Sequence, residues 1–339
     1  MFKVTFFSSK QYDIEFFKKQ LDAPENASYG FSFKFFEGRL SLDNVSLAKG
    51  SDAVCVFVND RVDREIVDAL YANGVRILAL RCAGFNNVSL RAAQNKLKIV
   101  RVPAYSPYAV AEHALCLMLA LNRHIHRAYN RTREGNFALG GLLGFDMNGK
   151  TCGIIGTGKI AKVLIKSLVG LGVKVLGYDV YPDEQAAKAI GFEYVTLPEL
   201  YRDSDIISLH CPLTKETEYL VSAESISKMK PGVMLINTSR GQLVNTKDFV
   251  EGLKSGAIGA AGLDVYEEES DYFFEDCSDD VITDDVLSRL MTFPNVIVTA
   301  HQAFFTQEAL TNIADTTMEN IRCYIDGRPL VNEVLYTPK

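Results

Sequence analysis

The chain has 339 residues, more than one hydrophobic core usually covers, so we expect two domains. Its formal net charge of −6 argues against binding to nucleic acid or to a membrane surface, because both attract a basic face. No apolar run approaches the roughly 20 residues of a membrane span, and the seven scattered cysteines form no C-x-x-C pair. We therefore expect a soluble protein of the reducing cytoplasm.

Short β-prone runs alternate with helical patterns from Lys3 onward, which is typical of a parallel sheet covered on both faces. The first of these runs predict a small doubly wound domain over residues 1–101. We expect its strands at 4–7, 31–36, 53–57, 77–80 and 99–102, and its helices near 12–20, 65–71 and 90–95.

A long helical segment is predicted at residues 108–127, after a pair of prolines. Its middle is apolar on nearly all sides, which favours burial between domains or subunits and hence a homodimer or homotetramer. We interpret His113 on this helix as a core histidine. His124 and His126 are two residues apart and face different sides of a helix, so they predict no metal site. Residues 131–144 are polar and glycine-rich enough to form an arm or linker.

Residues 151–161 predict a strand that turns directly into a helix. Gly156, Gly158 and Ala161 have the spacing G-x-G-x-x-[GA]: the first permits a tight turn, the second lets a pyrophosphate approach, and the third allows close helix packing. The N–H groups that begin the helix face the phosphates. The next apolar run ends in Asp179, close to the expected ~20 residues downstream, where a carboxylate accepts ribose hydroxyls and repels a 2′-phosphate. The pattern therefore predicts NAD rather than NADP.

The alternation continues as a second doubly wound sheet. We expect its further strands at 173–178, 206–210, 233–237, 259–264 and 296–299. A helix at 307–324 should return to the first domain. The predicted fold class is α/β, with two doubly wound parallel-sheet domains of Rossmann or flavodoxin-like type and a cleft between them. Residues 1–101 and 300–339 would form a substrate domain, and residues 102–299 the NAD-binding domain.

An acidic stretch runs from Glu267 to Asp285, with ten acidic residues, no basic one, and three aromatic residues at 272–274. Its spacing lacks the D-x-[DN]-x-[DN]-G pattern of a calcium loop. We expect a solvated loop that its aromatic residues anchor.

Three predicted strands end in groups that can carry chemistry. Arg240 follows one strand, and a guanidinium there can clamp a carboxylate with two parallel hydrogen bonds. Glu269 follows the next strand, and His301 follows the last one. Ligands of open α/β sheets bind beyond the carboxyl ends of the strands, so we expect these three side chains to meet in one site.

The sequence also resembles the D-2-hydroxyacid dehydrogenase family over nearly its whole length, and most closely the fermentative, NAD-dependent branch that makes D-lactate. The resemblance rests on four stretches: 79–88 (ALRCAGFNNV), 101–107 (RVPAYSP), 121–129 (LNRHIHRAY) and 208–214 (SLHCPLT). It implies that Arg240 binds the substrate carboxylate, that His301 is the acid and base, and that Glu269 is its carboxylate partner.

The resemblance further implies contacts with substrate and cofactor. Backbone N–H groups near Ala83 and Gly84 would help to hold the substrate carboxylate. Apart from the resemblance, the bulk of the aromatic residues Phe57, Tyr105 and Phe304 indicates that they would wall the pocket on the substrate side and favour a substrate as short as pyruvate. The residues that would line the cofactor are Gly156, Gly158, Lys159, Ile160, Asp179, Cys211, Pro212, Thr238, Ser239, Arg240 and Asp264.

Two other interpretations stay open. The same fold could act on glyoxylate, hydroxypyruvate or a longer 2-ketoacid, whereas formate oxidation is disfavoured because that branch pairs its histidine with glutamine. A non-catalytic NAD-sensing scaffold, like the corepressors that share this fold, is the second. It is disfavoured because the chain has neither long tails nor a basic nuclear-localisation run.

Overall fold

The computed structural model describes residues 1–269 and 272–337, and the chain divides into two compact units. Unit 1 is Met1–Ser106 with Phe305–Lys339, and unit 2 is Pro107–Phe304. The expected domain boundaries, after residues 101 and 299, lie a few residues before the observed divisions after Ser106 and Phe304. The first division falls where helix α4 begins, at a proline, which suits a first helical residue because its N–H would have no partner within the helix.

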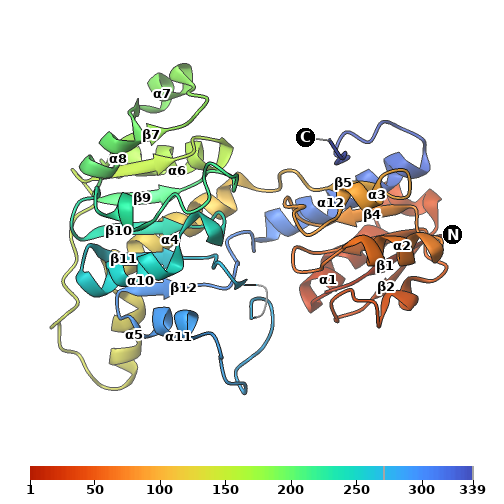
Figure 1. The fold of residues 1–339 in the computed structure, drawn as a ribbon, viewed down its shortest axis with the longest axis horizontal. Coiled ribbons are helices and arrows are strands. Elements are labelled where there is room, and N and C mark those ends of the chain that lie inside the picture. Colours follow the sequence, from red (N-terminus) through yellow and green to blue (C-terminus); the bar gives the residue numbers. More distant parts are fainter. Residues whose placement is uncertain (270–271, 338–339) are drawn as a thin grey trace. The chain divides into compact units, whose positions relative to one another are not determined.

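Unit 1 contains a five-stranded sheet in which every pairing is parallel, in the order β2-β1-β3-β4-β5, the flavodoxin-like order (Figure 1). The strands are β1 (Phe2–Phe6), β2 (Phe31–Phe35), β3 (Ala53–Val56), β4 (Ile77–Leu80) and β5 (Lys98–Arg101). The helices are α1 (Gln11–Leu21), η1 (Pro24–Tyr29), η2 (Val45–Ala48), α2 (Arg64–Ala72), α3 (Leu90–Ala93) and α12 (Gln307–Ile325).

The C-terminal helix α12 packs on the sheet of unit 1, together with α1. Met318 and Ile321 of α12 and Phe17 of α1 share one buried cluster with strand residues such as Phe6 and Ile77. A segment more than 200 residues away in sequence therefore completes this core.

Unit 2 contains a seven-stranded parallel sheet in the order β12-β11-β10-β9-β6-β7-β8. Read from β8, this is the Rossmann order with one further strand at the far edge. The strands are β6 (Thr151–Ile155), β7 (Lys174–Tyr178), β8 (Glu193–Tyr194), β9 (Ile206–Leu209), β10 (Val233–Asn237), β11 (Ile258–Leu263) and β12 (Val296–Val298). The helices are α4 (Pro107–Asn122), α5 (Ile125–Arg133), α6 (Lys159–Gly170), α7 (Glu184–Ile190), α8 (Leu197–Asp203), α9 (Ala223–Ile226), α10 (Thr246–Ser255) and α11 (Asp285–Thr292), with η3 (Gly241–Leu243). The predicted class, two doubly wound parallel sheets, is confirmed.

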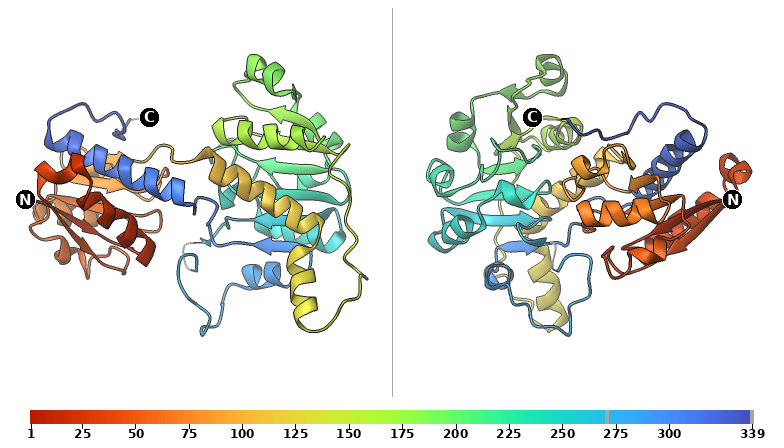
Figure 2. Two further views of the ribbon diagram at one scale, coloured as in Figure 1. Left: turned by 180° about the vertical axis from the view of Figure 1, so that it is seen from behind. Right: turned by 45° about the vertical axis from the view of Figure 1, so that its right-hand side comes forward.

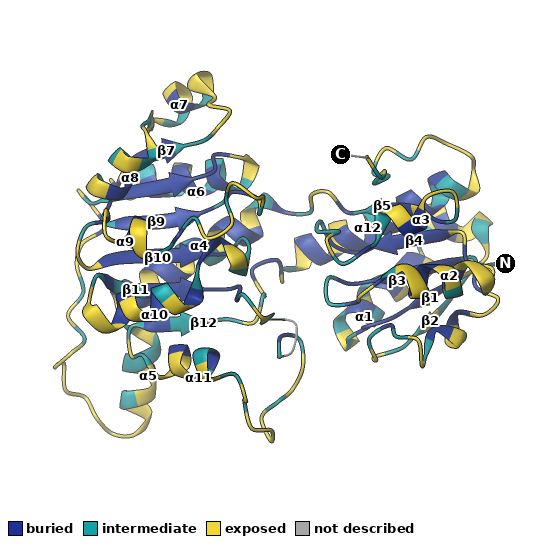
Figure 3. Ribbon diagram, viewed as in Figure 1, coloured by how far each residue is buried: buried dark blue, intermediate teal, exposed yellow. Residues whose placement is uncertain are grey.

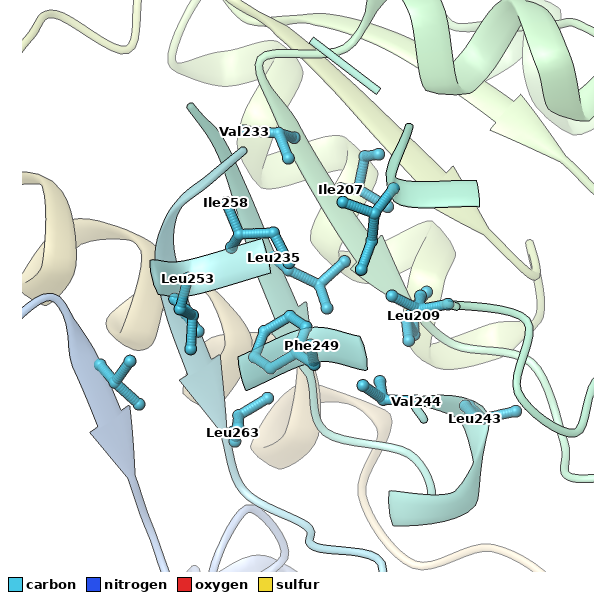
Figure 4. Close-up of a cluster of buried hydrophobic side chains, with 14 of the residues drawn as sticks. Ile207, Leu209, Val233, Leu235, Leu243, Val244, Phe249, Leu253, Ile258 and Leu263 are labelled. Carbon is cyan, nitrogen blue, oxygen red and sulfur yellow. The ribbon is translucent and has the colours of Figure 1, made fainter. Parts of the chain in front are cut away.

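Helices cover both faces of the second sheet, which buries its strands (Figure 3). On one face α4 and α6 lie side by side (Figure 2) and contribute Leu117, Met118 and Leu164 to the core. On the other face Phe249 of α10 is wholly buried, and Figure 4 shows it among side chains of β9, β10 and β11. The strands that carry the candidate site are therefore held from both sides. No helix in the described ranges is long and apolar enough to cross a membrane.

The prediction of a single helix at 108–127 is wrong, because the helix is interrupted between α4 and α5. His124 adopts a left-handed backbone with φ +50°, which interrupts the helical hydrogen bonds. At the end of α4 the Asn122 side chain exchanges two hydrogen bonds with the backbone of Phe145, each 2.8 Å long. This contact with a distant segment fixes the end of α4, and no proline or glycine marks it in the sequence.

One buried ion pair ties the sheet of unit 1 to α1. Arg81, directly after β4, is only 1% exposed, and its Nε donates to Asp13 Oδ1 at 3.0 Å. Its Nη2 donates to the Ser8 carbonyl at 2.6 Å, and its guanidinium lies 4.9 Å from the centre of the Phe57 ring.

We predict that Asp13→Ala lowers the free energy of unfolding of unit 1 by about 3–5 kcal/mol, since it leaves a buried guanidinium without its counter-charge. Urea unfolding followed by circular dichroism measures the change. Glu15→Ala, an exposed change on the same helix, is the control and should shift the transition by less than about 0.5 kcal/mol. Equal transitions for the two variants would contradict the importance of this ion pair.

Candidate active site

The glycine loop after β6 has the geometry of a phosphate-binding turn. Gly156 has φ +88°, and a Cβ added there would lie 2.6 Å from the Cys211 backbone nitrogen, so no larger residue fits. Gly158 is the N-cap residue of α6, and a Cβ added to it would meet no described atom within 4 Å. Ala161 is wholly buried, as close packing of the helix on the sheet requires. The loop thus leaves open space at the start of a 12-residue helix whose first N–H groups receive no side-chain cap.

Asp179, directly after β7, is fixed beside this loop. Its Oδ2 accepts the Thr157 backbone N–H at 2.6 Å and the Thr157 hydroxyl at 3.1 Å, and its Oδ1 accepts the Tyr181 N–H at 2.9 Å. Burial alone would raise the pKa of the Asp179 carboxyl, but these backbone hydrogen bonds bring it below its usual value. The group is therefore a carboxylate at neutral pH, where it repels a 2′-phosphate.

The residues present fit a dinucleotide. Besides the open space at Gly158, the side-chain oxygen of Thr238 is buried and has no hydrogen-bond partner among the described residues, as expected of a group that awaits a ligand. Ser239, beside it, donates its hydroxyl to the Leu209 carbonyl at 2.9 Å, which ties the ends of β9 and β10 together. Cys211 is buried, and burial raises the pKa of its thiol to about 11, so it is a neutral wall residue. Lys159 and Ile160 are the first residues of α6, and Pro212 follows Cys211 in the loop after β9.

His301 and Glu269 meet directly. The His301 Nδ1 lies 2.8 Å from Glu269 Oε1, and the other carboxylate oxygen of Glu269 accepts the Tyr266 backbone N–H at 3.0 Å. The Phe274 ring lies 5.7 Å from the imidazole, centre to centre. Because Nδ1 faces the carboxylate, the second ring nitrogen, Nε2, is the one that can serve a ligand.

Arg240 stands at the end of β10, and β11 lies next to β10 in the sheet. The two strand ends are pressed together, since a Cβ added to Gly241 would lie 2.0 Å from the Tyr266 carbonyl oxygen. The Arg240 backbone carbonyl accepts the Asn237 side-chain amide at 2.8 Å, and its guanidinium donates to the Ser239 carbonyl at 2.6 Å. Arg240, Glu269 and His301 thus follow three adjacent parallel strands, β10, β11 and β12.

Asp264, predicted to line the cofactor, is wholly buried directly after β11. Its carboxylate accepts the Thr299 hydroxyl at 2.6 Å and the backbone N–H groups of Gln302 and Ala303, each at 2.9 Å. Its own carbonyl accepts the His301 N–H at 2.8 Å. Asp264 therefore holds the turn that presents His301.

The acidic loop is anchored as predicted, as far as its described residues show. Phe273 is buried in the core of unit 2, and the Tyr272 hydroxyl lies 3.0 Å from the Thr283 hydroxyl. The Tyr266 hydroxyl donates to Asp284 at 2.7 Å. These contacts fix the segment that carries Glu269. Within the described residues, no group of three His, Cys, Asp or Glu side chains could hold a metal ion.

The other predicted substrate residues are distributed over both units. Phe57 is buried at the end of β3, Ala83 and Gly84 are half-buried after β4, and Tyr105 is half-buried near the end of the first segment of unit 1. Phe304 is buried in unit 2.

The roles of two residues in unit 2 were not predicted from the sequence. Thr157 holds Asp179, and His113, taken for a core histidine, contacts both Thr299 and Asp264. Thr157 lies between the two loop glycines, so the pattern itself marks its position. The polar contacts of His113 join residues far apart in sequence, and no local pattern marks them.

Known proteins resemble this chain in sequence and in fold. A family profile described as "D-isomer specific 2-hydroxyacid dehydrogenase, NAD binding domain" matches residues 115–303. The D-lactate dehydrogenase of Escherichia coli K12 is 50% identical over 334 residues, which cover 98% of this chain and 100% of that protein. The pyruvate reductase of Chlamydomonas reinhardtii has a similar structure, with a TM-score of 0.91, 44% identity and 98% coverage of both chains. The structure of the D-lactate dehydrogenase of Lactobacillus jensenii with NAD+ gives a TM-score of 0.80 at 30% identity, over 98% of this chain and 100% of that one.

We predict different effects for two glycine-to-alanine substitutions in the glycine loop, each of which adds one methyl group. Gly156→Ala should destabilise unit 2, because its methyl group meets backbone and its φ is positive. Gly158→Ala should leave the melting temperature within about 2 °C, yet weaken NADH binding at least tenfold, because its methyl group enters the space left for the phosphates. Differential scanning calorimetry and NADH fluorescence titration measure the two effects. Unchanged NADH affinity in Gly158→Ala would contradict the placement of the cofactor.

Proposed function

Since the chain belongs to the D-isomer specific 2-hydroxyacid dehydrogenase family, we propose that it is an NAD-dependent D-lactate dehydrogenase, which reversibly reduces pyruvate to D-lactate. The family is one of NAD-dependent oxidoreductases. The observation that carries the proposal is the His301–Glu269 hydrogen bond of 2.8 Å. It forms beyond the ends of β11 and β12, and β10, which precedes Arg240, lies next to β11 in the same sheet. The D-lactate dehydrogenase activity of a full-length relative at 50% identity supports the choice of substrate.

The proposed roles follow from the chemistry of each group. NADH, when bound, supplies the hydride. Arg240 pairs with the pyruvate carboxylate through its planar fork, which orients the ketone. His301 then donates the proton on its Nε2 to the carbonyl oxygen of pyruvate. The Glu269 carboxylate, hydrogen-bonded to His301 Nδ1, orients the ring and stabilises its protonated form. One hydride on carbon and one proton on oxygen convert the ketone into the alcohol, and lactate oxidation returns the proton to His301.

The proposed size of the substrate and configuration of the product rest on the pocket residues and on the family resemblance. The roles proposed for Ala83 and Gly84 come from the family resemblance, and so does the D configuration of the product. The roles proposed for Phe57, Tyr105 and Phe304 come from the bulk of their aromatic rings. The alternative is a related dehydrogenase that acts on glyoxylate, hydroxypyruvate or a longer 2-ketoacid. A higher kcat/KM for any of these substrates than for pyruvate would favour the alternative over the proposal. A chiral assay of the product tests its configuration.

We predict that His301→Gln lowers kcat for pyruvate reduction by ~10²-fold or more, because the proton donor is lost. Arg240→Lys should mainly raise KM for pyruvate, because an ammonium cannot reproduce the two parallel bonds. Steady-state kinetics separate the two effects, and NADH titration shows whether each variant still binds the cofactor. His126→Gln, outside the proposed site, is the control and should keep wild-type values. Wild-type turnover by His301→Gln would refute its role.

The Asp179 carboxylate should make the protein selective for NADH. We predict that the wild type uses NADH with a kcat/KM at least 100-fold higher than that for NADPH, and that Asp179→Ser narrows the ratio by about tenfold or more, since it removes a charge that repels the 2′-phosphate. Asp183→Asn, an exposed change nearby, is the control. Equal efficiency of the wild type with both cofactors would contradict the assignment.

We further propose that the protein is a homo-oligomer. Large apolar side chains are exposed along α4, α5 and the segment after it, and exposed apolar surface of this extent typically marks an interface. These residues are Leu119, Ile125, Tyr129, Phe137, Leu139, Leu143 and Phe145. Two of them, Leu139 and Leu143, are 82% and 91% exposed.

Sedimentation velocity tests this proposal. We expect the wild type to sediment as a dimer or tetramer and the double variant Leu139→Lys with Leu143→Lys to shift toward the monomer. Val281→Lys is the control, because Val281 is 85% exposed but lies in the acidic loop. A monomeric wild type would refute the interface.

The cytoplasm is the proposed location. All seven cysteines are free thiols, and five of them are buried. A chain with this many unpaired thiols suits a reducing compartment.

A further inference from the structure

His113 forms polar contacts with two residues, Thr299 and Asp264, that lie close to His301 in the structure. It lies on α4, and its side chain is 17% exposed. Its Nε2 is 3.1 Å from the Thr299 hydroxyl oxygen and 3.4 Å from Asp264 Oδ1. Three separate segments of unit 2 therefore meet at this imidazole: α4, the end of β11 and the end of β12.

The contacts fix the direction of the hydrogen bonds. The Thr299 hydroxyl has one proton, which it donates to Asp264 Oδ1 at 2.6 Å. In the contact with His113 the hydroxyl oxygen must therefore accept, so His113 Nε2 carries a hydrogen. The result is a chain of donors that runs from His113 through Thr299 to Asp264.

Asp264 passes this restraint to His301. Its carboxylate also accepts the backbone N–H groups of Gln302 and Ala303, and its carbonyl accepts the N–H of His301. His301 itself has φ +52°, a left-handed backbone that a non-glycine residue keeps only where its surroundings enforce it. The hydrogen bonds of Asp264 are the enforcing contacts on both sides of this residue.

We propose that His113 is a positioning residue for His301. Through Thr299 and Asp264 it stiffens the turn at 299–303, and it thereby directs His301 Nε2 toward the carbonyl of the substrate. The inference rests on the proposed function in so far as His301 is the proton donor. His113 itself touches neither substrate nor cofactor in this role.

The kinetic test compares two replacements. His113→Gln places an amide N–H near the position of Nε2 and can still donate to Thr299, whereas His113→Leu cannot. We expect His113→Leu to lower kcat by about 10- to 100-fold, because a small misplacement of the proton donor is costly, with NADH affinity within about twofold of wild type. His113→Gln should recover most of kcat. Glu112→Gln, an exposed change on the same helix, is the control.

A second readout does not depend on the substrate. The chain has five histidines, so histidine-labelled protein gives few imidazole signals, which single substitutions assign. We expect His113→Leu to shift the ring signals of His301 in the protein bound to NADH, and Glu112→Gln to leave them in place. If His113→Leu does not fold, Thr299→Val breaks the same chain of hydrogen bonds and should shift the same signals.

The outcomes are separable. A wild type that reduces no pyruvate refutes the proposed function, but a His301 shift in His113→Leu would still support the positioning role. An unshifted His301 signal would overturn that role. So would a wild-type kcat in His113→Leu, or a His113→Gln variant as slow as His113→Leu.

Discussion

The parallel pairing of β10, β11 and β12 is the constraint on which the candidate site depends. In a parallel sheet all carboxyl ends lie at one edge, so residues that follow neighbouring strands are brought together even when they are far apart in sequence. Asn237 pairs with Leu263, and Leu263 pairs with Val298, so the register is continuous across the three strands. Glu269 and His301 reach each other from the ends of two of them. A slip of one residue would turn every following side chain to the other face.

The regular parts of the fold were predictable from the sequence because they repeat a local pattern. Each buried strand is a short run of apolar, β-prone residues, and parallel strands buried on both faces need such runs. The predicted strands agree with the observed ones to within one or two residues, as at Val233–Asn237. The short strand β8 and the helices α7 to α11 were not assigned, since most of them are brief. The end of α4 could not be predicted, because a long-range contact of Asn122 decides it.

The candidate site, like the fold, was predictable from the sequence only in its local features. The positions of Arg240, Glu269 and His301 could be inferred because each lies a few residues after the end of an apolar run. The glycine spacing identified the phosphate loop, and the structure gives the reason for Gly156, where a side chain would collide with the Cys211 backbone. What the sequence could not supply are the supports behind these groups. Thr157 under Asp179 and His113 beside Asp264 act through side-chain contacts that follow only from the tertiary packing.

The left-handed backbone of His301 also bears on the heat resistance of this protein. Such a conformation costs about 1–3 kcal/mol for a residue with a side chain, and here it falls on the residue proposed to transfer the proton. Library screens that select for thermostability alone would therefore tend to favour glycine or asparagine at this position, at the expense of turnover. A stabilised industrial version should instead be sought among loop residues away from positions 299–303.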